Sequence, residues 1–471
     1  MAKFVVAGLS VVSVKLITTY LGAAGYGRYS VVYEMMAFAG IIADFGFFHI
    51  ALREIGKNIE NVKVILSNIL TMRISLALFA SLITFTIVFF FTDYDTQTVK
   101  YGLIIALGTA VIGLMGTTIT AVLQVHLKMT FAAVIQIIGK IAMIGYIWYA
   151  IQNDLGFLHM LWSGLFGSLL ILIFNYLYAV RFSAITLGFD WPLWKKLLKE
   201  TYPMGLALIF YNLSLRAPIL MLDRIVRNEA LTGMYGVAQR IIEVMIFIPL
   251  AFMNSVLPSA SRFIHENTKE AKEKLRLLIQ HSFDFLNAVS LPVIAGGIAM
   301  APEIIRIISD EEFTKSIYIF QILISMIFFY YLSTLFGYIL FAYGKQILYM
   351  KSNLLAAIAT IISGVIVTIY AAEYGALTAH ILAEVISMSV SYYYLRPFLH
   401  TSIRFKNLFR TLCATLVMFL SLIYMKGFIQ EYGNIVTLGI SVVSSSIIYL
   451  LFLLIFKALP LKEVVQYVFK K

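Results

Sequence analysis

Ten charged side chains lie inside apolar stretches that are long enough to cross a bilayer as helices. A charge at the centre of a bilayer costs at least about 2.5 kcal/mol, so such a group faces a polar interior or a partner. Arginine binds phosphate through a fixed fork of donors, and lysine binds it as a point charge. We therefore expect a cationic cavity that binds an anionic diphosphate, formed by Arg216, Lys15, Arg240, Lys140 and Arg73.

Roles without any substrate contact also remain open for these cations. Lys15 and Arg216 lie about six residues from the ends of their stretches, close enough to reach the headgroups by snorkelling. Lys140 shares a face with Gln136, a polar stripe that lines either a cavity or a helix contact. Arg73 lies near the predicted inner boundary, where an anchor in the inner leaflet is as good an interpretation as a substrate contact.

The carboxylates inside the apolar stretches have two interpretations as well. We expect Asp44, Glu34, Glu243 and Glu384 either to bind a coupling ion or to pair with cations. For Asp44 we favour a structural partnership with Lys15 or an arginine of the same half, and Glu243 is placed to neutralise Arg240 three residues earlier. His380 and Glu384 are one turn apart, a spacing that suits proton relay or metal binding. Two ligands without a third make a weak metal site, and no metal or cofactor is predicted.

The elements that position these groups follow from composition. Of 471 residues 61% are hydrophobic and 13% are charged, and the mean hydropathy is +0.91. A soluble protein has about twice that share of charge. The single cysteine, Cys413, excludes disulfides within the chain. Apolar stretches of spanning length predict an all-α membrane protein of about fourteen transmembrane helices, at 2–21, 29–51, 65–91, 101–124, 131–151, 157–180, 201–222, 233–257, 279–301, 316–342, 352–372, 374–395, 408–425 and 434–456.

The basic residues predict an orientation. With the N-terminus inside, 24 of the 36 Lys and Arg fall in inner loops and termini and seven fall in outer loops. Positive residues concentrate on the cytoplasmic side, so we expect both termini there, in the plasma (inner) membrane. Because the charge is spread over many short loops, nucleic-acid binding is a poor explanation of the net charge of +12.

The longest inner connections have distinct characters. Residues 181–200 combine Trp191 and Trp194 with lysines and leucines, which suits a helix lying in the headgroup region. Residues 266–278 mix Lys and Glu at helical spacing and predict a solvated extension of the ninth span. We expect an N-lobe at 1–181, an interfacial linker at 182–200, a C-lobe at 201–396 and two further helices at 397–471.

The chain contains an internal repeat. The segment 21–29 resembles 222–235: Leu21 matches Leu222 at an offset of 201, while Gly27 and Tyr29 match Gly233 and Tyr235 at 206. At the first offset Lys15 falls on Arg216. Six helices separate the copies, so they share an orientation, which is the parallel type of transporter repeat.

Two regions carry a family resemblance. They are similar to the first two and the seventh-to-eighth helices of polysaccharide-type transporters in the multidrug/oligosaccharidyl-lipid/polysaccharide exporter superfamily. The motifs are Tyr20-Leu21-Gly22, Tyr26-Gly27-Arg28-Tyr29, Asp44-Phe45-Gly46 and Arg53-Glu54 in the first region, and Asp223-Arg224-Ile225, Gly233-Met234-Tyr235-Gly236-Val237-Ala238, Pro249 and Leu257-Pro258-Ser259 in the second.

The resemblance implies two six-helix lobes around a central cavity, with two extra C-terminal helices. It also implies export of a polyprenyl-diphosphate-linked oligosaccharide to the outer leaflet by alternating access, for cell-surface polysaccharide such as O-antigen. The expected partners are that lipid-linked sugar and membrane lipids, and other polysaccharide-assembly membrane proteins remain open as partners.

Three alternatives remain. A multidrug and toxin extrusion antiporter would share the core, but its cationic drugs call for an acidic cavity. A membrane polymerase or ligase acting on the same lipid-linked sugars would need a sizeable outer loop, and the predicted loops are short. A non-transporting scaffold would tolerate loss of Arg216. The chain has no GxxxxGK[ST], HExxH or GxSxG motif, and we expect that it is not an enzyme.

Overall fold

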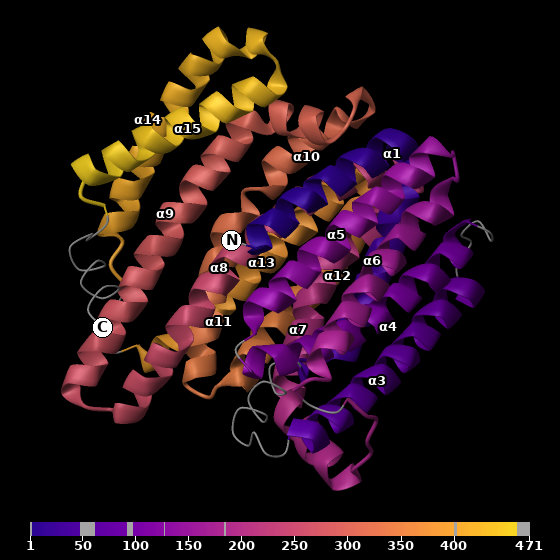
Figure 1. Cartoon of the computed structure of the whole chain (residues 1–471). Helices are drawn as coiled ribbons and strands as arrows, with labels where there is room; N and C mark the ends of the chain where they lie inside the picture. The colour runs from indigo at the N-terminus through magenta and orange to yellow at the C-terminus, as the bar shows by residue number, and fades with distance from the viewer. Residues whose placement is uncertain are drawn as a thin grey trace. The chain divides into compact units, whose positions relative to one another are not determined.

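The computed structural model describes residues 2–47, 62–91, 98–126, 128–182, 185–399 and 403–458, and all regular structure in these ranges is helical (Figure 1). The first helices are α1 (Ala2–Asp44), α3 (Val62–Phe91), α4 (Thr98–Val125), α5 (Met129–Gln152), α6 (Phe157–Ala179) and α7 (Trp191–Val226). They are followed by α8 (Glu229–Glu266), α9 (Lys269–Ile308), α10 (Lys315–Leu323), α11 (Met326–Ala342), α12 (Gln346–Ala371), α13 (Glu373–Leu395), α14 (Lys406–Ile429) and α15 (Asn434–Ile455).

The helices confirm an all-α membrane protein. Within the described residues, twelve helices are long and apolar enough to cross a membrane. One of them, α1, consists of two helices joined at Gly22, and α13 has spanning length although it carries more polar residues. Counting both parts of α1 and adding α13 gives the fourteen predicted crossings. Large apolar side chains of α3, such as Phe79 and Leu82, are 60% and 64% exposed, which suits contact with lipid.

The connection between the first two spans is a bend rather than the predicted loop at 21–29. Gly22 has φ +64° and ψ −177°, a conformation open almost only to glycine. Helical geometry resumes at residue 23, so the second span begins earlier than predicted and its helix ends at Asp44. The predicted end of that span at 48–51 and the Arg53-Glu54 motif lie outside the described residues.

The chain divides into two compact units, 1–236 and 237–471. In the first unit α4 packs against α3 and α6, and α5 packs against α6 (Figure 1). The two parts of α1 contact α3, α4, α5 and α7. A cluster of buried apolar side chains, Phe47, Ile69, Met72 and Leu197, joins the ends of these helices. This packing fixes the charged groups of α1, α3 and α7 relative to each other.

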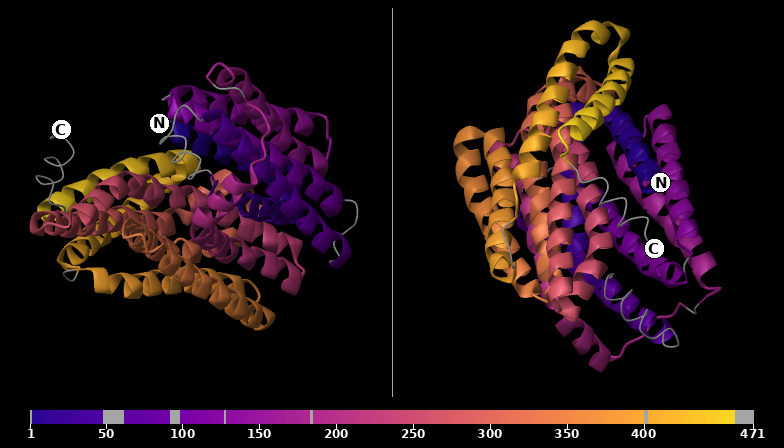
Figure 2. Two further views of the ribbon diagram at one scale, coloured as in Figure 1. Left: turned by 90° about the horizontal axis from the view of Figure 1, so that it is seen from below. Right: turned by 90° about the vertical axis from the view of Figure 1, so that its left-hand side faces the viewer.

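In the second unit α13 packs against α11 and α12, and α9 contacts α11, α14 and α15. Helices α14 and α15 form the yellow hairpin of Figure 2. A single residue, Ala372 with φ +46°, separates α12 from α13. The helices can meet this closely because Gly375 has no side chain; a Cβ there would lie 2.2 Å from the backbone nitrogen of Thr368.

One predicted helix boundary, between residues 200 and 201, was wrong. The interfacial linker helix and the seventh span form one 36-residue helix, α7, which runs through Pro203 and Pro218. Its start is capped by Asp190, whose carboxylate accepts a hydrogen bond from the Leu193 amide. The predicted span 316–342 is confirmed as one stretch of spanning length, Lys315–Ala342, with a two-residue turn at 324–325 between α10 and α11.

Candidate functional site

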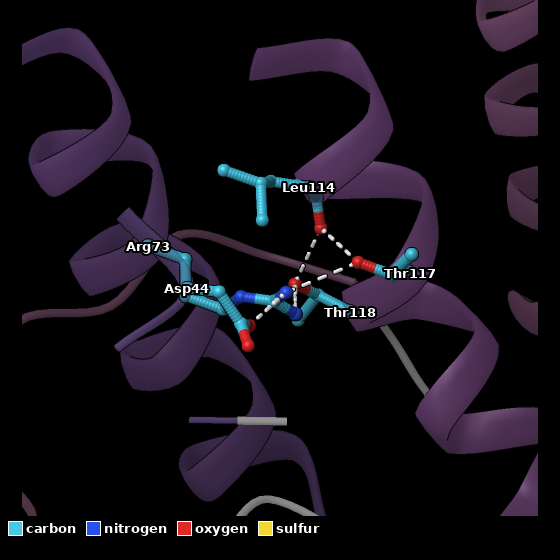
Figure 3. A network of polar contacts seen from close by, with 5 residues as sticks. All are labelled: Asp44, Arg73, Leu114, Thr117 and Thr118. Carbon is cyan, nitrogen blue, oxygen red and sulfur yellow. Dashed lines mark hydrogen bonds and ion pairs between the residues drawn. The ribbon is translucent and has the colours of Figure 1, made fainter. Parts of the chain in front are cut away.

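Arg73 is the centre of a buried polar network in the first unit (Figure 3). Its guanidinium donates to the Asp44 carboxylate at 2.5 Å, to the Thr118 hydroxyl at 2.5 Å and to the Thr117 hydroxyl at 3.1 Å. Both threonines in turn donate to the carbonyl oxygen of Leu114 on α4. Arg73 is 2% exposed. The network therefore ties α1, α3 and α4 together, and Arg73 does not reach out to headgroups as an anchor would.

Arg216 and Glu34 form a second buried ion pair in the same unit, between α7 and the second part of α1. Glu34 is 1% exposed and the Arg216 side chain 11%. Snorkelling does not describe Arg216, because its guanidinium binds a carboxylate inside the protein. Asn212, one turn before Arg216, instead donates its amide hydrogen to the Leu208 carbonyl of its own helix.

Helices α1 and α8 meet at a glycine seam formed by Gly27 of α1 and Gly233 of α8. A Cβ at Gly27 would lie 1.9 Å from the carbonyl oxygen of Glu229, and a Cβ at Gly233 would lie 2.0 Å from the carbonyl oxygen of Ala23. The contacts are reciprocal, because Ala23 and Glu229 are separated by the same 206 residues as the two glycines. Reciprocal contact is the property of an interface with two-fold symmetry. The seam agrees with the parallel repeat and its second offset.

The Arg240–Glu243 pair lies on α8 within the second unit. The Arg240 guanidinium donates to the Glu243 carboxylate at 2.6 Å, the neutralising arrangement that one of the two interpretations requires. Both side chains are only partly buried.

The two lysines are less deeply buried than Arg73. Lys15, on the first part of α1, and Lys140, on α5, are half-buried. The Lys140 ammonium lies 3.5 Å from the sulfur of Met143.

Glu384 and His380 are buried on α13, with exposed fractions of 3% and 1%. Among the described residues no group of three or more His, Cys, Asp or Glu is placed to hold a metal ion.

Two further polar contacts have no signal in the amino-acid sequence. Lys426 of α14 donates to the carboxylate of Glu303 on α9 at 2.9 Å, and Glu303 is buried. Asn68 of α3 accepts from the Asp190 amide at 2.7 Å and from the Trp194 indole at 3.1 Å, which fastens the start of α7. Both join residues more than a hundred positions apart, so no local pattern marks them.

The three arginines share one chemical property: each is already paired with a carboxylate. A phosphate group must compete with that carboxylate for the same donors. Because both are anions that accept charge-assisted hydrogen bonds, the exchange is close to balanced and reversible. Such pairs can bind an anion for transport and still release it.

Comparison with known proteins places this geometry in context. Residues 1–264 match the family model described as polysaccharide biosynthesis protein, and residues 203–366 match the MatE family model. A search of curated protein sequences finds no match.

Several solved structures share the fold. A lipid II flippase MurJ in an inward closed conformation superposes with a TM-score of 0.75 at 14% identity, covering 97% of both chains. An inward-facing multidrug resistance MATE family transporter gives 0.65 at 14% identity, over 84% of this chain and 94% of its own. A superfamily transporter from Pyrococcus furiosus, titled for its reverse-polarity binding pocket, gives 0.54 at 11% identity, over 84% and 95%. At these identities the likeness establishes the fold alone.

Proposed function

Because this chain belongs to the polysaccharide biosynthesis protein family, whose model matches residues 1–264, we propose that it is a flippase for lipid-linked sugar. It moves a polyprenyl-diphosphate-linked oligosaccharide from the inner to the outer leaflet of the plasma membrane, for synthesis of cell-surface polysaccharide. Both termini lie in the cytoplasm, and the protein carries its cargo without altering it. The lobes at 1–181 and 201–396, the linker between them and the two C-terminal helices are its working parts.

The observation that carries this proposal is the extent of the fold likeness. The structure titled lipid II flippase covers 97% of this chain, whereas the multidrug transporter covers 84%. The extra length that this chain has beyond the multidrug transporter is thus shared with a lipid II flippase. That shared length favours a lipid-linked cargo over a small drug.

The proposed role of Arg216 is to bind the diphosphate by exchanging its partner. In the described structure its guanidinium holds Glu34, so the cation is kept inside the protein without the cost of an unpaired buried charge. An arriving phosphate replaces the carboxylate and gains bidentate hydrogen bonds. Return of Glu34 then displaces the phosphate. The exchange lowers the cost of moving an anion through an apolar protein and also permits release.

The proposal gives different roles to the other four cations, Lys15, Arg240, Lys140 and Arg73. Lys15 occupies the repeat position equivalent to Arg216 and, with Lys140, offers a flexible point charge to the sugar diphosphate. Arg240 contributes once it parts from Glu243. Arg73 is buried and its guanidinium already binds Asp44, Thr117 and Thr118, so its contribution is to hold the helices rather than to touch cargo.

A second candidate is export of a small organic cation by a multidrug-type antiport. The match of the MatE model to residues 203–366 favours it. Such a protein needs carboxylates available to a cation, whereas Glu34, Asp44 and Glu243 are each paired with an arginine here. Drug-resistance assays in a sensitive strain distinguish this candidate.

The proposal is tested by complementation in a strain that lacks its own polysaccharide flippase. The variants are Arg216→Ala, Lys15→Ala and the charge swap Arg216→Glu/Glu34→Arg, compared at matched membrane levels. Arg262→Ala is the control, because its pair with Glu266 is exposed and spans 3.7 Å, and such pairs contribute about 0–1 kcal/mol.

The unaltered chain and the control are expected to restore surface polysaccharide, and the swap is expected to fold but fail. The swap restores a buried ion pair while moving the cation to α1, so it separates stability from phosphate binding. Restoration by the swap would mean that the pair is only structural. Restoration by every variant would remove Arg216 and Lys15 from the site.

A further inference from the structure

A buried polar stripe runs along one face of α13 in the second unit. His380, Glu384, Ser387 and Ser391 follow each other at intervals of four, three and four residues, which places them on one helix face. All four are 3% exposed or less. An α-helical rise of 1.5 Å per residue makes the stripe about 16 Å long. Polar side chains buried along so much of a spanning helix are costly and therefore point to a function.

The C-terminal part of the stripe, Ser387 and Ser391, is joined by hydrogen bonds to neighbouring helices. Ser387 donates to the side-chain oxygen of Asn353 on α12 at 3.2 Å, and its hydroxyl lies 3.3 Å from that of Ser333 on α11. Ser391 donates to the hydroxyl of Ser352 at 2.9 Å. These groups account for one another's hydrogen-bonding needs, as buried polar groups normally do.

Glu384 does not share in these bonds. Its Oε2 atom is buried and accepts no hydrogen bond from any described residue, and no cation of the described chain forms an ion pair with it. A buried carboxylate without a counter-charge is so unfavourable that the group binds a proton instead. Glu384 thus differs from Glu34, Asp44 and Glu243, each of which forms an ion pair with an arginine.

Among the described residues no cation forms an ion pair with Glu384; Arg240, whose partner Glu243 interacts with His380, is held by that carboxylate. The groups that face the stripe are Tyr349 of α12, which interacts electrostatically with Glu384, Tyr338 of α11 beside it, and Glu243 of α8, which interacts with His380. The Lys315 and Tyr318 side chains of α10 contact Glu373, eleven residues from Glu384 along α13, or about 16 Å.

We propose that Glu384 is a proton-binding site and that the stripe from His380 to Ser391 conducts its proton. In the described structure the carboxyl holds the proton; when the region opens to water the carboxylate releases it, and a proton from water on the other side restores the acid. The number of protons is conserved in each cycle. The claim that this proton drives transport rests on the proposed function. The claim that Glu384 binds a proton does not.

A proton fits the site better than a sodium ion. A metal cation needs several oxygen ligands at once, but the Ser387 hydroxyl already donates to the Asn353 oxygen and lies beside the Ser333 hydroxyl. A proton needs a single acceptor, and Glu384 Oε2 is one. The intervals of one helical turn between His380, Glu384 and Ser387 also suit transfer along a chain of such groups.

The proton site is tested by infrared difference spectroscopy on the full-length protein in lipid, at neutral pH. The carbonyl band of a protonated carboxylic acid is expected in the unaltered protein and in the control Glu266→Gln, which changes an exposed acid. Glu384→Gln, which keeps the shape and neutrality of the acid, should fold normally and lose that band. A band unchanged in Glu384→Gln would overturn the proposal, as would binding of radioactive sodium that Glu384→Gln abolishes.

Coupling is tested by complementation with the same two variants. Glu384→Gln cannot release a proton and is expected to lower surface polysaccharide at least tenfold, whereas Glu266→Gln leaves it unchanged. Full export by Glu384→Gln would refute proton coupling. If the unaltered chain exports nothing, the proposed function fails, and the infrared result decides on the proton site by itself.

Discussion

The glycine seam between the two repeat motifs makes a sharp prediction about Gly233→Ala. The new Cβ would lie 2.0 Å from the carbonyl oxygen of Ala23, and ordinary contacts begin at 3.4 Å. The helices must therefore separate by more than an ångström, because the obstructing atom belongs to the backbone and cannot rotate away. Overpacking of this kind costs about 1–3 kcal/mol, which shifts the closed population of the seam by roughly 5- to 150-fold.

The assay is cross-linking across the seam. Arg28 and Glu229 form an ion pair at 3.0 Å with both side chains partly exposed, so cysteines at these positions are within reach of a short bifunctional thiol reagent. Cys413 is first replaced by alanine, since it is the chain's single cysteine. Gly233→Ala is expected to lower the cross-linking rate by at least fivefold.

The matched control is Gly113→Ala, in the same unit, where a Cβ meets nothing within 4 Å. It should leave the rate unchanged and stabilise α4 by up to about 1 kcal/mol, as alanine does in a helix. Gly236→Ala should have an intermediate effect, because its Cβ meets the rotatable hydroxyl of Ser30 at 2.4 Å. Equal rates in Gly233→Ala and Gly113→Ala would refute the reasoning about the seam.

The remaining predictions concern ion pairs. Arg73→Met should destabilise the protein by about 3 kcal/mol, because it breaks a buried pair, and adding Asp44→Asn should recover part of the loss; melting temperatures in detergent measure both, and simple additivity would contradict the pairing. Lys426→Met should lower the melting temperature by leaving Glu303 buried without its cation, and Glu303→Gln in the same chain should restore much of it. A hydrogen bond from a neighbouring lysine lowers the pKa of Glu270 at the solvated start of α9. The stabilising contribution of this contact is therefore present above the unfolded pKa near 4.3 and is lost as pH falls through the lowered value. Hydrogen exchange in 269–278, corrected for intrinsic rates, should be faster at low pH, and no change would contradict this.

The fold was largely predictable because each helix that crosses a membrane requires an apolar stretch of about 20 residues. Apolar stretches of spanning length placed nearly every helix, including α12 and α13, which are separated only by Ala372. The predicted helix boundaries were wrong where the polarity of a segment did not indicate its backbone conformation. A polar linker continues as helix into α7, and Gly22 bends the chain without the loop that residues 21–29 suggested.

The candidate site was predictable as a set of charged residues but not as a set of partners. Arg240 and Glu243 are three positions apart, so local spacing was enough to anticipate their pair. Arg216 and Glu34 are 182 positions apart, and nothing in either segment indicates which helices will pack together. The reciprocal contacts of Gly27 and Gly233 were partly predictable. The internal repeat singles out both residues, but it does not indicate that they contact each other's segments.

The most direct test of the proposed function is lipid movement by the purified protein in liposomes. Undecaprenyl diphosphate bearing a labelled sugar is placed in one leaflet, and its appearance in the other is followed with an impermeant reagent. The unaltered protein is expected to move the lipid and the charge swap Arg216→Glu/Glu34→Arg is expected to fail, although both melt at similar temperatures. Equal movement by both proteins would contradict phosphate binding at Arg216, and no movement by the unaltered protein would contradict the assignment as a flippase for this class of lipid.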